Sequence, residues 1–439
     1  MSGGLLTDLY ELNMAASYLR RGMTDVATFS LFVRDLPPER GFLVAAGLDP
    51  ALDWLERLSF GPDELDYLAR TGFDAATLHA LERLRFTGEV WAVPEGRIVF
   101  ASEPLLEVSA PIAEAQLAET FLLNQLTFHT TLASKAARCR VAAAGRIELV
   151  EFGFRRTQGV EAAFAVARLA ALVGFVGTSN VEAARRFDLR TSGTMAHSYV
   201  EAFPTETDAF RAYAHDLPGP VTFLVDTYDT QEGVANALEV IGELGLARAA
   251  AVRIDSGDLV ALARQARRML DDAGLHRVRI FVSGGLDEHD LARLVANDAP
   301  VDAAGIGTRL GVSADAPYLD SVYKLVAYGD RPVVKLSPGK RTLPGAKQVF
   351  RGPGMRDVLG LRGEPPPPGT HPLLEPVMRA GKRLSASSDL DTARKRFESD
   401  LDELPPPALA LRDPQAPEAE LSDALRRLVD ATGAPPAPP

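Results

Sequence analysis

The sequence predicts an α/β protein in which an irregular α/β barrel follows an α+β domain. Between residues 147 and 308, short apolar runs alternate with amphipathic helical patterns, as in a parallel sheet covered on both faces. The candidate strands are Ile147–Glu151, Leu172–Val176, Val221–Val225, Ala249–Ile254, Arg279–Val282 and Asp302–Ala304. Six strands fit either an open sheet or an irregular barrel, and the polar residues that follow each strand favour the barrel.

The regions on either side of the barrel have a different pattern. Residues 88–111 contain short strands interrupted by Pro and Gly, and residues 332–336 and 347–351 predict an antiparallel hairpin. These regions resemble each other, so we expect the chain after the barrel to complete the first domain. The predicted domains are 1–120 completed by 326–362, a catalytic barrel at 121–325, and a C-terminal part at 363–439 with a proline-rich linker (363–372) and two helices (391–401 and 417–429).

Several helical regions precede the first predicted barrel strand, among them residues 7–21 and 112–144. Thr7 to Arg21 reads as a helix with Asp8 as N-cap and Glu11 three positions on, which predicts a capping box. A second apolar face contains Tyr10 and is expected to pack either within its own domain or against another subunit. Residues 112–144 form a long helix-forming stretch, which predicts more than one helix or a kinked one.

Charge and composition exclude several classes of protein. The 439 residues have a formal net charge of -12, which argues against a nucleic-acid surface. Cys139 is the sole cysteine, so no intrachain disulfide and no cysteine-rich zinc site is expected. The sequence has neither the pattern of a signal peptide nor an apolar stretch of bilayer length, so we expect a cytoplasmic protein without membrane contact.

Every predicted strand ends in polar residues or glycine. In a barrel these ends form the active site, although helix N-caps also favour Ser, Thr and Asp. Two glycine pairs, in Ser283-Gly284-Gly285 and in Gly305-Ile306-Gly307-Thr308, suit a phosphate monoester because backbone N–H groups can approach an anion there. The sequence contains neither a Gly-x-Gly-x-x-Gly motif nor a Walker A motif, which disfavours a dinucleotide fold and an ordinary P-loop.

Charged residues at the same strand ends predict a phosphorylated sugar with a metal-bound pyrophosphate. Arginines can bind phosphate, and aspartates can hold ribose hydroxyls or Mg²⁺ through water. Some of these side chains are expected simply to pair with one another. The residues concerned are Arg155, Arg156, Arg253, Asp226, Asp229, Asp255 and Asp258.

His197 lies in a polar, small-residue segment, Asp188 to Val200, that interrupts the strand and helix rhythm. A histidine beside an anion site can act as acid, base or phosphoryl acceptor. A structural role is the alternative that the pattern leaves open.

The motifs in their order resemble the nicotinate phosphoribosyltransferase family. The resemblance runs from Thr7 to about Ala327 and rests on Thr-Asp-Leu-Tyr-Glu-Leu-Asn-Met, Glu-Phe-Gly-Phe-Arg-Arg, Gly-Thr-Ser-Asn, Gly-Thr-Met-Ala-His-Ser, Leu-Val-Asp-Thr-Tyr-Asp-Thr, Arg-Ile-Asp-Ser-Gly-Asp, Ser-Gly-Gly-Leu-Asp and Gly-Ile-Gly-Thr. It implies the irregular barrel of the type II phosphoribosyltransferases and a homodimer with shared active sites. The implied reaction joins nicotinate to 5-phosphoribosyl 1-pyrophosphate, gives nicotinate mononucleotide and pyrophosphate, and uses Mg²⁺ and ATP, with ATP hydrolysis coupled through a phosphohistidine in NAD biosynthesis.

The resemblance also implies roles for individual residues. His197 is the residue to be phosphorylated, and it forms the catalytic set with Arg253 and Asp255. The other implied roles are substrate binding by Tyr10 (from the neighbouring subunit), Phe152, Arg155, Thr178, Ser179 and Asp226, and 5-phosphate binding by Ser283, Gly284, Gly285, Gly305, Gly307 and Thr308. Direct Mg²⁺ ligands are not implied.

Ser179 bears on the choice between nicotinate and its amide. The related nicotinamide enzymes have an acid at this position, which would accept a hydrogen bond from an amide but repel a carboxylate, so Ser179 favours nicotinate. The alternatives are a nicotinamide phosphoribosyltransferase and a non-catalytic phosphosugar-binding barrel.

Overall fold

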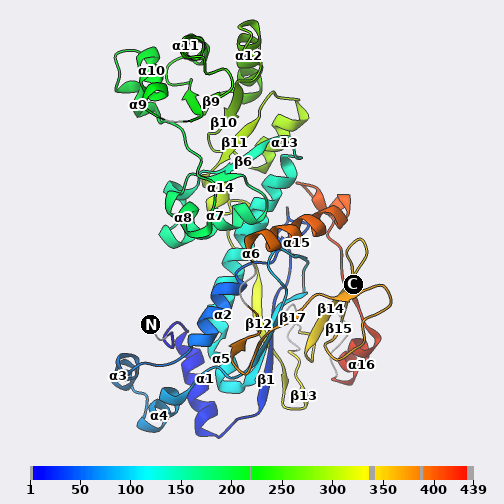
Figure 1. Ribbon diagram of the computed structural model, residues 1–439. Coiled ribbons are helices and arrows are strands. Elements are labelled where there is room, and N and C mark those ends of the chain that lie inside the picture. The colour runs from blue at the N-terminus through cyan, green and yellow to red at the C-terminus, as the bar shows by residue number, and fades with distance from the viewer. Residues whose placement is uncertain (1–2, 218, 336–341, 386–388, 433–439) are drawn as a thin grey trace. The chain divides into compact units, whose positions relative to one another are not determined.

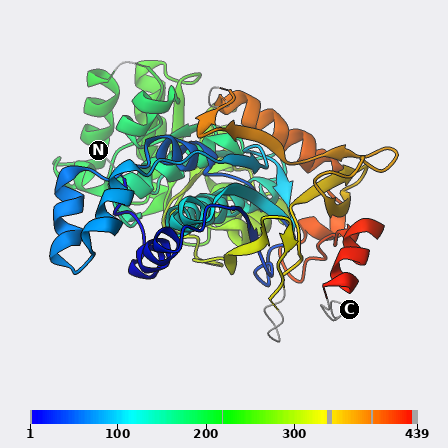
Figure 2. The same cartoon turned by 90° about the horizontal axis from the view of Figure 1, so that it is seen from below.

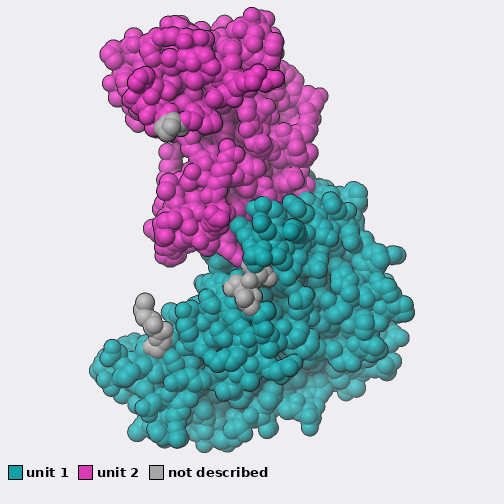
Figure 3. Space-filling model, viewed as in Figure 1, with its two compact units in different colours: residues 1–134, 318–439 teal, residues 135–317 magenta. Residues whose placement is uncertain are grey.

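The computed structural model describes residues 3–217, 219–335, 342–385 and 389–432. The chain forms two compact units, which Figure 3 colours separately: residues 1–134 with 318–439, and residues 135–317. We call these unit 1 and unit 2. Unit 2 contains the predicted barrel strands, and unit 1 joins the N-terminal region to the chain that follows the barrel.

Unit 2 is built on a parallel sheet with helices in the connections (Figure 1). In sheet order, its described strands are β7 (Gly177–Thr178), β6 (Glu148–Glu151), β11 (Ala303–Ile306), β10 (Arg279–Val282), β9 (Ala250–Ile254) and β8 (Val221–Leu224). All five pairings are parallel, and the order leaves β7 and β8 as edges. The predicted strand number and parallel α/β architecture are confirmed.

The helices of unit 2 follow the strands, as in a β/α fold. They are η1 (Phe154–Arg156), α7 (Val160–Leu172), α8 (Val181–Phe187), α9 (His197–Glu201), α10 (Glu206–Asp216), α11 (Thr230–Leu244), α12 (Leu259–Asp272), α13 (Glu288–Ala296) and α14 (Thr308–Gly311). Helices α11 and α12 both pack against β9. Because a helix begins after each of these strands ends, the strand-to-helix loops gather at one edge of the sheet.

The strand predicted at Leu172–Val176 is wrong. Helix α7 continues through Leu172, and the chain joins the sheet only at Gly177. The preceding run is rich in Ala and Leu, which are strong helix formers. Gly174, with φ of 98°, then follows the helix in a conformation that other residues rarely adopt.

Unit 1 is centred on a seven-stranded sheet in which early and late chain lie side by side. In sheet order the strands are β13 (Arg331–Pro332), β12 (Ser321–Tyr328), β1 (Val26–Val33), β5 (Pro104–Pro111), β3 (Glu89–Ala92), β17 (Glu375–Arg379) and β18 (Lys382–Arg383). Strand β1 pairs antiparallel with both β5 and β12. The chain that follows unit 2 therefore adds a strand directly beside the first strand of the protein.

Two smaller sheets complete unit 1. They consist of β2 (Leu43–Val44) with β4 (Ile98–Val99), and of β16 (His371–Pro372), β14 (Lys347–Gly352), β15 (Arg356–Leu361) and β19 (Glu420–Leu421). The hairpin predicted between residues 332–336 and 347–351 is wrong, because β13 pairs with β12 and β14 pairs with β15. Gly329 and Gly354, both with positive φ, occupy the two turns that set these pairings. Residue 336 lies outside the described residues.

The C-terminal part packs within unit 1. Strand β16, at the end of the segment predicted as a linker, pairs with β14, and β19 pairs with β15. Helix α16 (Asp423–Ala431) contacts β15, and the turned view of Figure 2 shows it beside that sheet. The predicted helix at 391–401 is confirmed as α15 (Leu390–Glu403), whereas the helix predicted from 417 begins only at Asp423, after β19 and an N-cap at Ser422.

The remaining helices of unit 1 include the predicted N-terminal one. They are α1 (Leu9–Arg20), α2 (Leu48–Arg57), α3 (Pro62–Arg70), α4 (Ala75–Arg83), α5 (Ile112–Leu117), η2 (Pro406–Leu409) and the start of α6 (Glu119–Ala142). The division of residues 112–144 into more than one helix is thus confirmed. Over the described ranges, every helix is too short or too polar to cross a bilayer.

The capping box predicted for α1 is wrong. Asp8 occupies the N-cap position but makes no capping bond, and its carboxylate instead accepts a hydrogen bond from Thr120 Oγ1 at 2.7 Å. Glu11 is buried and accepts from Thr120 N at 3.0 Å. Both acids therefore tie α1 to the start of α6. Tyr10 remains 48% exposed on α1.

Candidate active site

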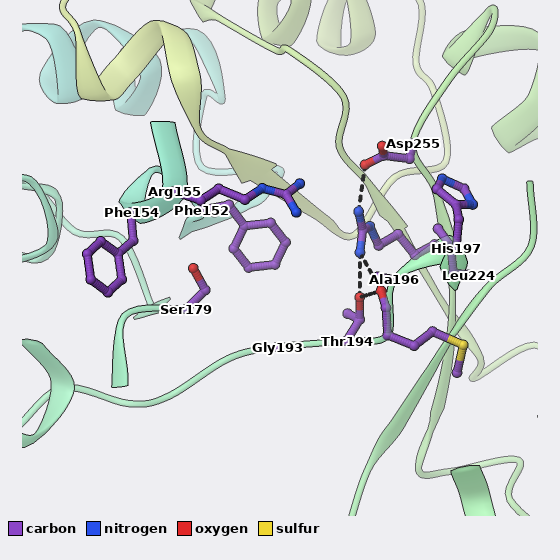
Figure 4. A pocket seen from close by; sticks show the side chains of 12 residues that line it. Phe152, Phe154, Arg155, Ser179, Gly193, Thr194, Ala196, His197, Leu224 and Asp255 are labelled. Carbon is purple, nitrogen blue, oxygen red and sulfur yellow. Dashed lines mark hydrogen bonds and ion pairs between the residues drawn. The ribbon is translucent and has the colours of Figure 1, made fainter. Parts of the chain in front are cut away.

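A cavity of about 640 Å³ opens within unit 2 at the carboxyl ends of the parallel strands (Figure 4). Six residues predicted from the sequence line it together: Phe152, Arg155, Ser179, His197, Arg253 and Asp255. The other lining residues are Phe154, Gly193, Thr194, Met195, Ala196 and Leu224. The cavity is therefore formed by the ends of β6, β7, β8 and β9 and by the segment that precedes α9.

Arg253 is the centre of the polar network in this cavity. Its Nε donates to Ser283 Oγ at 2.7 Å, one terminal nitrogen donates to Thr194 Oγ1 at 2.5 Å, and the other donates to Asp255 at 2.6 Å. The same nitrogen that reaches Thr194 also lies 3.2 Å from the Met195 carbonyl oxygen. A planar guanidinium with five donors can make all these contacts at once, whereas a lysine ammonium cannot. Arg253 thus connects β9, β10 and the segment before α9.

Asp255 is held in its charged form by these neighbours. Partial burial raises the pKa of its carboxyl, but hydrogen bonds from Arg253 and Ser283 and the nearby charges of Arg253 and His197 lower it more. Ser283 Oγ donates to the same carboxylate oxygen as Arg253, at 2.5 Å. The result is a lowered pKa and an ionised carboxylate facing the cavity at neutral pH.

Asp226 does not line the cavity but holds the Asp255 backbone in place. Its Oδ2 accepts from Asp255 N at 2.9 Å and from Ser256 Oγ at 2.7 Å. Its Oδ1 is buried and has no hydrogen-bond partner among the described residues. A buried carboxylate oxygen without a donor is costly, and a bound cation would satisfy it.

Phe152 presents an aromatic ring to the cavity and is held on one side by Phe281. The two rings stack with centroids 5.6 Å apart and planes 23° apart. A Cβ on Gly305, within strand β11, would lie 2.5 Å from the Phe152 ring, so glycine is required there to make room for it. Gly305 therefore supports the cavity through Phe152, and it is not among the cavity-lining residues.

Glu151, which is buried, connects the ends of β6 and β7. Its two carboxylate oxygens accept from Thr178 Oγ1 at 2.5 Å and from Gly153 N. Burial raises the pKa of Glu151, and the two hydrogen bonds oppose that shift. Thr178 is buried in this contact, while Ser179, the next residue, reaches the cavity. Sequence reasoning missed Glu151, although an acid at the end of an otherwise apolar strand is a signal for such a role.

His197 lines the same cavity as Arg253 and Asp255, and Figure 4 shows it near Asp255. It is the first residue of α9, is half-buried, and has Nδ1 3.2 Å from Thr227 Oγ1. The segment before it is attached to β7, because Ser192 N donates to the Thr178 carbonyl oxygen at 2.9 Å. Thr194 in this segment contacts Arg253 and was not singled out from the sequence, where threonine carries no specific signal.

The glycines predicted to bind phosphate lie outside the cavity lining. Gly284 has φ of 101°, and a Cβ there would lie 1.8 Å from the Asp255 carbonyl oxygen, whereas Gly285 faces open space. Gly307 precedes α14, and Thr308, its first residue, is exposed. The close approach that requires Gly284 is thus to the protein's own backbone. Tyr10 belongs to unit 1 and is not among the cavity-lining residues.

An aromatic ring, two arginines, a histidine and a carboxylate at the carboxyl edge of a parallel α/β sheet are typical of an α/β enzyme, and the cavity they line could bind a small anion. Models of the nicotinate phosphoribosyltransferase N-terminal domain, family and C-terminal domain match residues 5–127, 147–338 and 366–429 of the chain. The chain belongs to the nicotinate phosphoribosyltransferase family.

Individual relatives agree with this assignment. A nicotinate phosphoribosyltransferase of Mycobacterium tuberculosis is 47% identical over 418 residues, covering 94% of this chain and 89% of that protein. The Bacillus subtilis enzyme of the same name is 43% identical over 357 residues, covering 79% and 72%. The crystal structure of human nicotinic acid phosphoribosyltransferase has a TM-score of 0.86 and 31% identity, covering 97% of this chain and all (100%) of that one. The predicted type II phosphoribosyltransferase fold is therefore confirmed.

Proposed function

We propose that this cavity joins nicotinate to 5-phosphoribosyl 1-pyrophosphate, yielding nicotinate mononucleotide and pyrophosphate, as a step in NAD biosynthesis. The observation that carries the proposal is the convergence of Phe152, Arg155, Arg253, Asp255 and His197 on one cavity in a member of this family. A flat aromatic ring, a free cation and a carboxylate match the chemistry of an aromatic acid and a phosphorylated ribose.

Nicotinate is proposed to lie against the Phe152 ring. Stacking on Phe281 fixes this ring, so it offers a rigid apolar face to the pyridine. Arg155 is exposed and makes no side-chain hydrogen bond or ion pair with described residues. Its guanidinium is therefore available to the substrate carboxylate or to phosphate oxygens.

In the proposed reaction the pyridine nitrogen lone pair forms a bond to C1 of the ribose while the bond from C1 to the pyrophosphate oxygen breaks. Pyrophosphate leaves with the bonding electrons, and positive character develops on the ribose. Asp255, kept ionised by Arg253 and Ser283, is placed to stabilise that charge. Arg253 already has four contacts, so we assign it chiefly to positioning Asp255 and Thr194, with the remaining N–H free for a phosphate oxygen.

Mg²⁺ fits the acidic residues of this region. The buried, unpartnered Oδ1 of Asp226 is a candidate ligand atom beside the Asp255 backbone. When bound, Mg²⁺ would supply positive charge that stabilises the departing pyrophosphate.

Coupling to ATP is proposed to pass through His197. The half-buried imidazole lies at the start of α9, and a phosphoryl group transferred to it from ATP would place negative charge beside Arg253 and Asp255. That charge would compete with Asp255 for Arg253 and so change the position of the 192–196 segment. Label from γ-labelled ATP that survives base, is lost in acid and is absent from His197→Ala would support this coupling. Absence of such label during turnover would overturn it.

A homodimer with shared sites is part of the proposal. Leu9 and Tyr10 are 63% and 48% exposed on α1, so this helix has apolar side chains available to a second copy. Tyr10 of the partner subunit would then cover the pyridine face opposite Phe152.

Substrate choice provides the experiment that tests the proposed reaction. Ser179 reaches the cavity beside Phe152, and a carboxylate there would repel the acid and attract the amide. We expect the parent protein to use nicotinate in preference to nicotinamide. Ser179→Asp should lower kcat/KM for nicotinate by about tenfold or more while Ser179→Ala leaves the preference unchanged.

Both bases and all three proteins would be compared by following mononucleotide formation. Exclusive use of nicotinamide by the parent would identify the other enzyme class. An unchanged kcat/KM for nicotinate in Ser179→Asp would remove Ser179 from the account of specificity.

A further inference from the structure

A second cavity, of about 260 Å³, lies in unit 2 at the opposite ends of the strands. It is lined by the residues that begin the strands, among them Val221, Ala250 and Arg279. The catalytic cavity, in contrast, is lined by residues at or after the strand ends, such as Leu224 and Asp255. The proposed reaction gives no role to the side chains of this second cavity apart from Phe281, which supports Phe152, and the segment Ser192 to Thr194.

The second cavity is strongly basic. Four arginines line it, Arg190, Arg248, Arg277 and Arg279, against one acid, Glu148. Glu148 is already paired with Arg279 at 2.8 Å. The other three arginines are exposed and make no side-chain hydrogen bond or ion pair with any described residue. Three unpaired cations around one small cavity, in a protein with a net charge of -12, indicate a site for a polyanion.

Ten apolar residues form most of the remaining lining, beside Ser192, Gly193, Thr194 and Thr222. The apolar residues are Val150, Val176, Pro220, Val221, Ala249, Ala250, Ala251, Ile280, Phe281 and Ala303. Inorganic phosphate would gain nothing from this surface, whereas a ligand with a flat ring and a phosphate chain would use both parts of the lining. The combination fits a nucleoside polyphosphate.

The two cavities share a wall. Gly193 and Thr194 line both, and Phe281, which lines the second cavity, stacks on Phe152, which lines the first. Thr194 also accepts the hydrogen bond from Arg253 at 2.5 Å. A ligand that moves Thr194 from the second cavity would therefore alter the contacts of Arg253 in the catalytic cavity.

We propose that this second cavity is a regulatory site for a nucleoside polyphosphate, bound by Arg190, Arg248 and Arg277 and coupled to the catalytic cavity through Thr194. Binding at this site does not depend on the proposed reaction. The effect of the bound nucleotide on turnover does rest on the proposed reaction, so nucleotide binding and turnover are measured separately.

The test compares Arg248→Gln/Arg277→Gln with the control Arg268→Gln. Arg268 lies on α12, is exposed, has no described partner and does not line the cavity. Equilibrium dialysis of the full-length protein with labelled ATP counts the bound nucleotides. We expect the parent and the control to bind one ATP per chain more than the double variant does. If the double variant still binds ATP in the second cavity, its Kd for that ATP should be at least about tenfold higher than in the parent. Adenosine should not compete for that site, and inorganic triphosphate should compete less well than ATP.

Thermal stability and ligand competition distinguish a nucleotide site from a helix-stabilising role and from a general polyanion site. Arg248 and Arg277 follow the carboxyl ends of α11 and α12, where cations also offset the helix dipole. If that were their only role, the double variant would lose thermal stability but bind ATP like the parent, and the proposal would fail. Equal competition by triphosphate and ATP would overturn the assignment of a nucleotide.

Coupling is measured by the KM for 5-phosphoribosyl 1-pyrophosphate at increasing ATP. We expect the dependence of this KM on ATP to differ between the double variant and the parent. In Arg268→Gln it should be the same as in the parent. An unchanged dependence would overturn the coupling. Absence of nicotinate mononucleotide formation in the parent would instead count against the proposed reaction and leave the dialysis result standing.

Discussion

At the scale of single residues, Arg253 decides the geometry of the candidate site. It contacts Ser283, Thr194, Met195 and Asp255 at once, from β9 to β10 and to the segment before α9. Its side chain is 10% exposed, so these contacts are shielded from water and are correspondingly strong. The sequence pointed to Arg253 as a phosphate ligand, but could not show that most of its donors are used within the protein.

Replacing Arg253 by lysine should therefore lower activity nearly as much as removing the charge. Lysine keeps the positive charge but cannot reach Ser283, Thr194 and Asp255 together. We expect kcat/KM to fall by about 100-fold or more in both Arg253→Lys and Arg253→Gln. Steady-state kinetics would check this, and near-normal activity of Arg253→Lys would show that only the charge of Arg253 matters.

A second prediction at this scale concerns pH. The Ser283 hydroxyl donates to Asp255 and helps to lower its pKa. Because the pKa is lowered, the charged form and any stability it provides are present above the usual carboxyl range and are lost as pH falls through the lowered pKa. Ser283→Ala removes one lowering contact, so the acidic limb of the kcat/KM profile should move to higher pH. An acidic limb that stays in place would mean that Asp255 does not govern it.

At the scale of elements, the ends of β6, β7 and β11 hold the aromatic face of the site. Glu151 ties β6 to β7 through Thr178, and Gly305 leaves the space that the Phe152 ring occupies. The sequence predicted Gly305 as a phosphate ligand because a glycine near a strand end suggests an approaching anion. The structure gives another reason for glycine, since the neighbouring ring comes from a distant part of the chain, which periodicity cannot show.

Gly305→Ala should displace the Phe152 ring, because the added Cβ would lie 2.5 Å from it. We expect a higher KM for nicotinate and a loss of about 1–3 kcal/mol in the free energy of unfolding. Gly242→Ala on α11 is the matched control, because its Cβ would meet nothing within 4 Å and alanine favours a helix. Equal KM values for the parent and Gly305→Ala would mean that the Phe152 ring does not contact nicotinate.

At the scale of the whole molecule, local pattern predicted the α/β architecture but not every pairing. Five of the six parallel strands and most helices of unit 2 could be predicted from apolar runs and helical spacing. The strand at residues 172–176 was wrong because an Ala-rich helix also reads as an apolar run. Strands β12 and β15 were not predicted, and they are the actual partners of β13 and β14, because pairing depends on which strands meet in space.

The candidate site, like the fold, could be predicted only where local sequence pattern carries the information. Six lining residues stand at strand ends or in the polar segment around His197, where sequence directs attention. Thr194 and Glu151 act through contacts with Arg253 and Thr178, and such contacts appear only once the chain has folded. The basic cavity at the other strand ends was likewise invisible, because its arginines lie between residues 190 and 279 and share no motif.

Pyrophosphate release shows directly whether the cavity around Arg253 performs phosphoribosyl transfer. In the parent protein, pyrophosphate should appear from 5-phosphoribosyl 1-pyrophosphate only when nicotinate is present, in amounts equal to the nicotinate mononucleotide formed. Release should fall by about 100-fold or more in Arg253→Gln. Tight binding of 5-phosphoribosyl 1-pyrophosphate without release of pyrophosphate, in the presence of nicotinate, ATP and Mg²⁺, would contradict phosphoribosyl transfer and identify a phosphosugar-binding barrel without this activity.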